Sequence, residues 1–176
     1  MKLIYAILAS FLCMAVFVGW VALMPPEGLA VGGPHPDYPA MSIGGDGAAR
    51  TRAIAAPVYL WQASVIVIAS LFILLGVSPQ RRTPLLFWLV GGAGAAMLAI
   101  WTLLFTSYLA AQASGETHYA LGFPIPTAWM VYGVFLSHFG FCAIYVFGFR
   151  RFVYSDADEA AFQQLLQDKN DGAFTE

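Results

Sequence analysis

The chain has 176 residues, of which 60% are apolar and only 10% are charged, and its formal net charge is -2. Soluble globular domains carry about a quarter charged residues, so this composition excludes an ordinary water-soluble enzyme, and it excludes a disordered protein, which needs low hydrophobicity and high net charge. The small negative charge provides no basic surface for nucleic acid, so we expect no nucleic-acid partner.

The charged residues divide the chain into long uncharged segments of 24, 28, 33 and 33 residues. A helix needs about 20 apolar residues to cross the hydrocarbon core of a bilayer, so each segment can hold one crossing but not two. The four-helix domain is expected to occupy residues 1–154. Transmembrane helices are predicted at about 3–24, 57–77, 85–110 and 126–149.

The fold class expected is an all-α membrane protein, a bundle of four transmembrane helices. Lipid-facing barrel strands alternate between apolar and polar residues, whereas residues 65–75 are almost continuously apolar. A helix satisfies its own backbone hydrogen bonds in lipid, which an isolated strand cannot do.

The distribution of Lys and Arg predicts the orientation. With four crossings both termini share one side, and six basic residues would lie there against two on the other side, so the positive-inside rule predicts that both termini are cytoplasmic. The six basic residues on the side of the termini are Lys2, Arg81, Arg82, Arg150, Arg151 and Lys169, and the two on the other side are Arg50 and Arg52. Because the chain is compact in a way typical of bacterial membrane proteins, we expect it in a bacterial inner membrane.

The segments outside the predicted helices are suited to docking. Residues 25–56 are rich in Pro and Gly, which disfavours regular structure and predicts an irregular outer flap. Trp129 and Tyr132 follow a rigid proline turn at the depth where amphipathic rings anchor a helix at the interface. Arg150 and Arg151 are expected to anchor its other end.

The tail, residues 155–176, is predicted to begin with a short amphipathic helix over about 155–167. Ser155 precedes several acidic residues, which suits a helix amino terminus. Phe162, Leu165 and Leu166 fall at i, i+3 and i+4 and form an apolar stripe. This helix either lies on the membrane surface or clamps a cytoplasmic partner.

His138 is the only ionisable side chain inside a predicted span. An imidazole there can ligate a haem iron or hold a quinone. No second histidine occurs at matching depth, so a bis-histidine haem would have to be shared with another subunit. The alternative is a neutral histidine that donates to a carbonyl or hydroxyl group on a neighbouring helix.

Small residues recur at every fourth position of the third span, at Gly91, Ala95 and Ala99. Such spacing lets two helix backbones approach closely. The stripe either packs inside the bundle, facing Gly133 and Ser137 of the last span, or contacts another subunit.

No autonomous catalytic motif and no spacing diagnostic of a metal site is present. We therefore expect a non-catalytic integral membrane subunit that stabilises a larger transport or respiratory complex with other membrane subunits. One alternative is an electron-transfer subunit that binds haem or quinone at His138. Another is a small carrier or channel for a neutral solute, with an outer vestibule lined by Gln62, Ser64, Thr102, Thr106 and Ser107.

Overall fold

A computed structural model describes residues 2–25, 29 and 32–170 and confirms four helices that are long and apolar enough to cross a membrane. The first three are α1 (Lys2–Ala22), α3 (Ala55–Leu75) and α4 (Pro84–Ser114). The fourth long helix, Ile125–Val153, consists of α5 (Ile125–Ala128), a π-helical turn (Trp129–Val134), α6 (Phe135–Gly148) and a second π-helical turn (Phe149–Val153).

The longest helix, α4, extends four residues beyond the predicted span. It begins at the cap residue Thr83, whose side chain accepts a hydrogen bond from the Leu86 amide, and it has Pro84 in its first turn. It ends at Gly115, which adopts the left-handed conformation with φ 69°. The helix continues past the predicted span because its end is set by this glycine and not by the end of the apolar segment.

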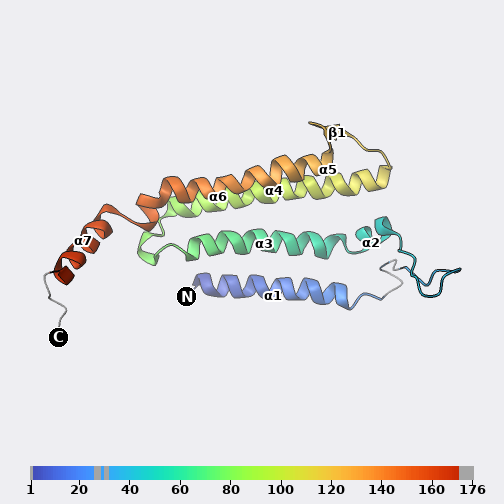
Figure 1. Ribbon diagram of the computed structural model, residues 1–176, viewed down its shortest axis with the longest axis horizontal. Coiled ribbons are helices and arrows are strands. Elements are labelled where there is room, and N and C mark those ends of the chain that lie inside the picture. The colour runs from blue at the N-terminus through green and yellow to red at the C-terminus, as the bar shows by residue number, and fades with distance from the viewer. Residues whose placement is uncertain (1, 26–28, 30–31, 171–176) are drawn as a thin grey trace.

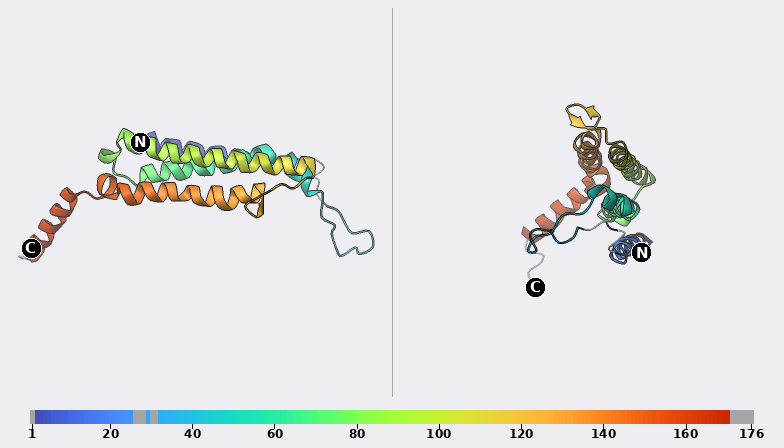
Figure 2. Two further views of the ribbon diagram at one scale, coloured as in Figure 1. Left: turned by 90° about the horizontal axis from the view of Figure 1, so that it is seen from above. Right: turned by 90° about the vertical axis from the view of Figure 1, so that its right-hand side faces the viewer.

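The four long helices pack mainly in chain order. Extensive contacts join α1 to α3, α3 to α4, and α4 to the fourth helix. Figure 1 shows that the start of α1 and the tail helix α7 lie at one end of the molecule, whereas α2 and β1 lie at the other. Seen along the helices in Figure 2, α1 and the fourth helix occupy opposite margins.

The flap between α1 and α3 is only partly irregular, and its residues 26–28 and 30–31 lie outside the described part of the chain. Pro34 pairs with Ser42 in an isolated bridge. Contrary to the prediction, residues Gly47–Ala53 form a helix, α2. Asp46 caps it by accepting hydrogen bonds from the amides of Ala48 and Ala49, which offsets the low helix propensity of the surrounding glycines.

The largest buried cluster lies near the end of the molecule that carries α7. Leu86 and Val90 of α4 are almost completely buried there, and they pack with Leu74, Val77 and Phe152. The cluster joins the end of α3, the start of α4 and the end of the fourth helix, so it fixes how these three helices meet.

Arg81 attaches the tail to this end of the bundle. It lies in the short 3-10 turn Pro79–Arg81 between α3 and α4, and it donates to the Val153 carbonyl at 2.6 Å and the Ser155 hydroxyl at 3.1 Å. It also forms an ion pair with Asp158. The first turn of the tail is therefore held against the α3–α4 link.

The tail forms α7 (Asp156–Asn170), which ends three residues later than predicted, and residues 171–176 lie outside the described part. Ser155 and Asp158 cap it reciprocally: the Asp158 carboxylate accepts from the Ser155 amide at 2.7 Å, and the Asp158 amide donates to the Ser155 hydroxyl at 3.4 Å. The hydrogen bond from Arg81, together with those from Ser155, lowers the pKa of Asp158 to about 2.

We predict that Arg81→Gln raises the pKa of Asp158 toward its usual value of 3.8 and increases amide exchange in α7. Because the folded-state pKa is depressed, the Asp158 contact contributes fully above about pH 3.8 and is lost as the pH falls through about 2. Carboxyl NMR titration and hydrogen exchange on the detergent-solubilised chain measure both effects. Arg50→Gln, the same charge change at the opposite end, should leave Asp158 unaltered. Identical titration of Asp158 with and without Arg81 would contradict this role.

Candidate functional site

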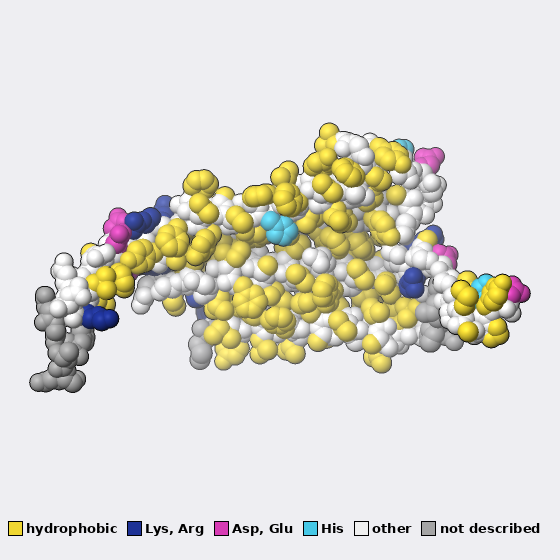
Figure 3. Space-filling model, in the orientation of Figure 1, with side chains coloured by type: hydrophobic (Ala, Val, Ile, Leu, Met, Phe, Trp, Pro, Cys, Tyr) yellow, Lys and Arg dark blue, Asp and Glu magenta, His cyan; other side chains and the backbone are white. Residues whose placement is uncertain are grey.

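His138 lies near the middle of the fourth helix, on its outward side. The helix approaches α4 at Gly140, where an added Cβ atom would lie 3.8 Å from that of Ala93. His138 is two positions from Gly140, which places its side chain on the opposite side of the helix, and it is exposed. Figure 3 shows one histidine surrounded by hydrophobic side chains on this face of the molecule.

The hydrogen bonding of His138 leaves one ring nitrogen open. Its Nδ1 lies 2.7 Å from the Val134 carbonyl oxygen, one turn earlier in the same helix. A carbonyl only accepts, so Nδ1 carries the proton of the neutral ring and the Nε2 lone pair points outward. The hydrogen-bond partner of His138 is thus a carbonyl group of its own helix. The sequence alone allows a partner on a neighbouring helix instead.

An outward Nε2 can accept a hydrogen bond or ligate a metal. It suits a donor on another helix, the hydroxyl of a quinol, or a haem iron. His35 and His118, the other histidines, lie in the segments at the far end of the molecule. A haem with two histidine ligands would therefore need its second ligand from outside this chain.

A π-helical turn, Trp129–Val134, immediately precedes this region of α6. Its Gly133 lies against α4 so closely that an added Cβ atom would be 2.6 Å from Ile100 Cγ2. The Val134 carbonyl that ends the turn accepts hydrogen bonds from both Ser137 and His138. Such π-helical turns are frequent at functional sites, and this one directs His138 away from α4.

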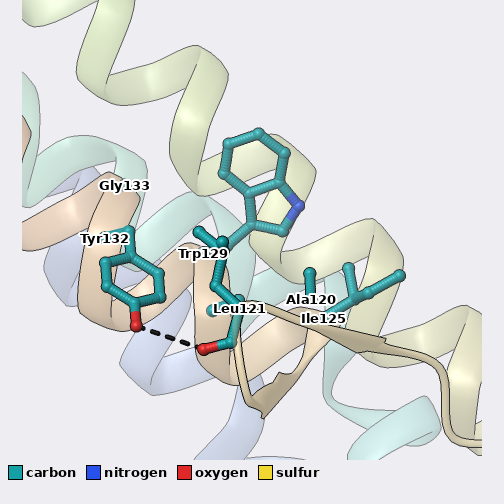
Figure 4. Close-up of a pocket in the computed structure, with 7 residues that line it drawn as sticks. Ala120, Leu121, Ile125, Trp129, Tyr132 and Gly133 are labelled. Carbon is teal, nitrogen blue, oxygen red and sulfur yellow. Dashed lines mark hydrogen bonds between the residues drawn. The ribbon is translucent and has the colours of Figure 1, made fainter.

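A pocket of about 450 Å³ lies at the start of the fourth helix (Figure 4). A two-stranded hairpin, β1 (Tyr119–Ala120) and β2 (Phe123–Pro124), covers it, and the Tyr132 hydroxyl donates to the Leu121 carbonyl at 3.3 Å. Leu121 has a φ of 52°, a strained value for a leucine. Of the two aromatic residues predicted as interface anchors, Tyr132 bonds to the hairpin and Trp129 is half-buried.

The small-residue stripe of α4 faces outward. Gly91, Ala95 and Ala99 are all exposed, and an added Cβ atom at Gly91 would meet nothing within 4 Å. The close approach of α4 to α3 is made at a different glycine, Gly94, where an added Cβ would be 2.8 Å from Ser70 Oγ. The closest approach of α4 to α3 therefore uses another residue of α4, and the stripe is left exposed within the described chain.

The predicted vestibule residues do not share a lining with His138. Thr102, Thr106 and Ser107 donate to carbonyl oxygens of α4 itself, and Ser64 donates to a carbonyl of α3. Thr102 also bonds to the hydroxyl of Tyr59 at 2.9 Å, which links α3 to α4. These hydroxyl groups are thus bonded within their own helices, and Thr102 also joins α4 to α3.

The remaining predicted residues lie near the junction of the fourth helix with α7. Arg150 pairs with Glu159 at 2.5 Å and with Asp156 at 3.4 Å. The Arg151 guanidinium lies 5.7 Å from the centre of the Phe152 ring. Phe162, Leu165 and Leu166 are exposed on α7.

The chain matches no protein-family model, and neither curated proteins nor solved structures show significant similarity to it.

We predict that His138→Leu leaves the thermal stability of the isolated chain almost unchanged, whereas Gly133→Leu lowers it. Outward substitutions change stability by about 0.5 kcal/mol or less, while overpacking costs about 1–3 kcal/mol, which corresponds to several degrees in Tm. Thermal unfolding of both variants in one detergent measures this difference. An equal loss in the two variants would mean that His138 contributes to the internal packing of the bundle.

Proposed function

We propose that the chain is an integral protein of a bacterial inner membrane, with both termini cytoplasmic, and that it is a non-catalytic subunit of a larger membrane complex. The observation that supports this most directly is the outward stripe Gly91, Ala95 and Ala99 on α4. The chain does not use these residues for its own packing, yet they have the spacing at which transmembrane helices associate.

The physical reason is that lipid offers no hydrophobic driving force for helix association. Helices in a membrane associate through van der Waals contact, which improves when small side chains let the backbones come close. Trp88, which is 80% exposed, and Leu103 lie toward the two ends of the stripe. A partner helix would therefore pack over a shallow surface between two large side chains.

The tail provides a second contact surface at the proposed cytoplasmic end. Phe162, Leu165 and Leu166 are 51%, 55% and 39% exposed. The acidic residues of α7 disfavour anionic lipid, because membrane-surface helices are typically rich in Lys and Arg. The described part of α7 carries Asp156, Asp158, Glu159 and Asp168 against Lys169 alone. This composition supports a protein partner with a basic, apolar groove.

A second candidate is an electron-transfer subunit, and the open Nε2 of His138 favours it. The nitrogen is at mid-span, where an unpaired acceptor is costly in hydrocarbon. In this function a haem iron or a quinol hydroxyl would satisfy it. A carrier for a neutral solute has less support, because the hydroxyl groups of its proposed pathway are bonded to their own helices.

We predict that the double variant Gly91→Leu, Ala95→Leu loses its partner. Two leucines on the stripe keep a partner backbone away, and we expect at least a ten-fold drop in assembled complex, about 1.4 kcal/mol. Native mass spectrometry after extraction in mild detergent measures it. Ala15→Leu, an exposed position on α1, is the matched control. Normal assembly of the double variant would remove the stripe from the interface.

The electron-transfer alternative predicts a coloured protein. A haem held by Nε2 gives a visible absorbance band in the extracted wild type, and His138→Leu abolishes the band while the chain stays folded. A colourless complex that retains its protein partner would rule out the haem form and leave the structural role.

A further inference from the structure

An apolar groove of about 620 Å³ lies between α3 and α6, toward the end from which α7 extends. Both helices pack extensively on α4. The groove therefore lies between them, with Leu86 of α4 in its lining. Its volume is within the range of about 300–1,000 Å³ typical of ligand pockets. Its walls include Phe72, Ile73 and Gly76 of α3 and Cys142, Tyr145 and Phe152 of the fourth helix.

Two arginines are anchored on the inner end of this groove. Arg82 donates from Nε to the Val77 carbonyl at 2.9 Å and from Nη2 to the Leu75 carbonyl at 3.3 Å, which leaves Nη1 without a partner among these bonds. Arg81 donates to the Val153 carbonyl at 2.6 Å. Val77 and Val153 both line the groove, one from each side. The α3–α4 link and the second π-helical turn are in contact, and Arg81 and Arg82 are hydrogen-bonded to residues that line this end of the groove.

The positive charges at this mouth are not all compensated. Asp158 pairs with Arg81, and two carboxylates pair with Arg150. Arg82 and Arg151 have no carboxylate partner among the described residues. Arg151 lies against the ring of Phe152, itself a wall of the groove. Figure 3 shows Lys and Arg side chains gathered at this end, next to the hydrophobic surface of the long helices.

We propose that this groove binds one anionic phospholipid, with its phosphate on Arg82 and Arg151 and one acyl chain between α3 and α6. Arginine binds phosphate oxygens in bidentate geometry, and basic pockets between transmembrane helices on the cytoplasmic side hold anionic headgroups. From Phe141 to Gly148 the groove follows two turns of α6, about 10 Å of apolar wall for the acyl chain.

This inference uses the proposed membrane orientation but does not require the proposed partner. Anionic lipids are concentrated in the cytoplasmic leaflet, which is where the positive-inside rule places this end of the chain. The experiment therefore uses the isolated full chain, so a failure of lipid binding is distinguishable from a failure of subunit assembly.

The test is native mass spectrometry of the chain released from nanodiscs that contain equimolar phosphatidylglycerol and phosphatidylcholine. We expect one retained lipid, enriched in phosphatidylglycerol by about thirty-fold, as two basic side chains near an anionic headgroup predict. The double variant Arg82→Gln, Arg151→Gln should lose the enrichment. Arg50→Gln, Arg52→Gln removes the same charge at the opposite end and should retain it.

A variant that fills the groove tests the acyl chain. Gly76 has φ -65°, and an added Cβ atom would meet only carbonyl oxygens at 3.6 Å, so Gly76→Phe is compatible with the fold. It should lower retention of both lipids. Addition of inorganic phosphate should leave the bound lipid in place, because the acyl chain contributes to binding.

Four results would overturn the proposal. Equal retention of the two lipids would show that the arginines select nothing. An equal loss in the Arg50, Arg52 control would show that net charge alone determines retention. Displacement by inorganic phosphate, or full retention in Gly76→Phe, would assign the arginines to headgroup binding without a lipid in the groove.

Discussion

The packing of two neighbouring helices against α4 is the interaction on which the rest of this structure depends. Glycines make both contacts close: Gly94 lets α4 approach Ser70 of α3, and Gly133 lets the fourth helix approach Ile100. Because α4 is in contact on these two sides, its third side, with Gly91 and Ala95, faces outward. The same geometry separates α3 from α6 and opens the lipid-sized groove between them.

The two proposed contact surfaces follow from this arrangement. Gly91 is two positions from Ala93, which contacts the fourth helix, so it points away from that helix. His138 is two positions from Gly140 and points away from α4. The stripe and the histidine therefore face opposite directions. A subunit built in this way would contact one neighbour through α4 and a second neighbour, or a cofactor, through α6.

Arg81 determines where the tail begins. A single guanidinium bonds a carbonyl at the end of the fourth helix, the capping hydroxyl of α7 and the carboxylate of Asp158. These bonds leave the apolar stripe of α7 uncovered, and they leave Arg82 and Arg151 without carboxylate partners in the described chain. Both proposed cytoplasmic functions, the binding of a protein partner by α7 and the binding of a lipid, thus depend on the hydrogen bonds and the ion pair of Arg81.

The number, position and helical nature of the four long segments follow from the pattern of charged and apolar residues alone. Uncharged runs of this length can satisfy their backbone only as helices, and this local requirement does not depend on neighbours. Local chemistry also predicted α7, through Ser155 and the acidic residues after it. It did not predict α2, because one capping aspartate outweighed the many glycines and prolines of the flap.

Only the tertiary structure decided which face of each helix is used. The small residues of α4 are spread around the helix, so their spacing alone did not distinguish Gly94, which packs on α3, from Gly91, which faces outward. The π-helical turn before α6 changes the rotation of that helix, and no periodicity rule anticipates it. Arg81 and Asp158 are 77 residues apart and meet only because the long helices bring both to the same end.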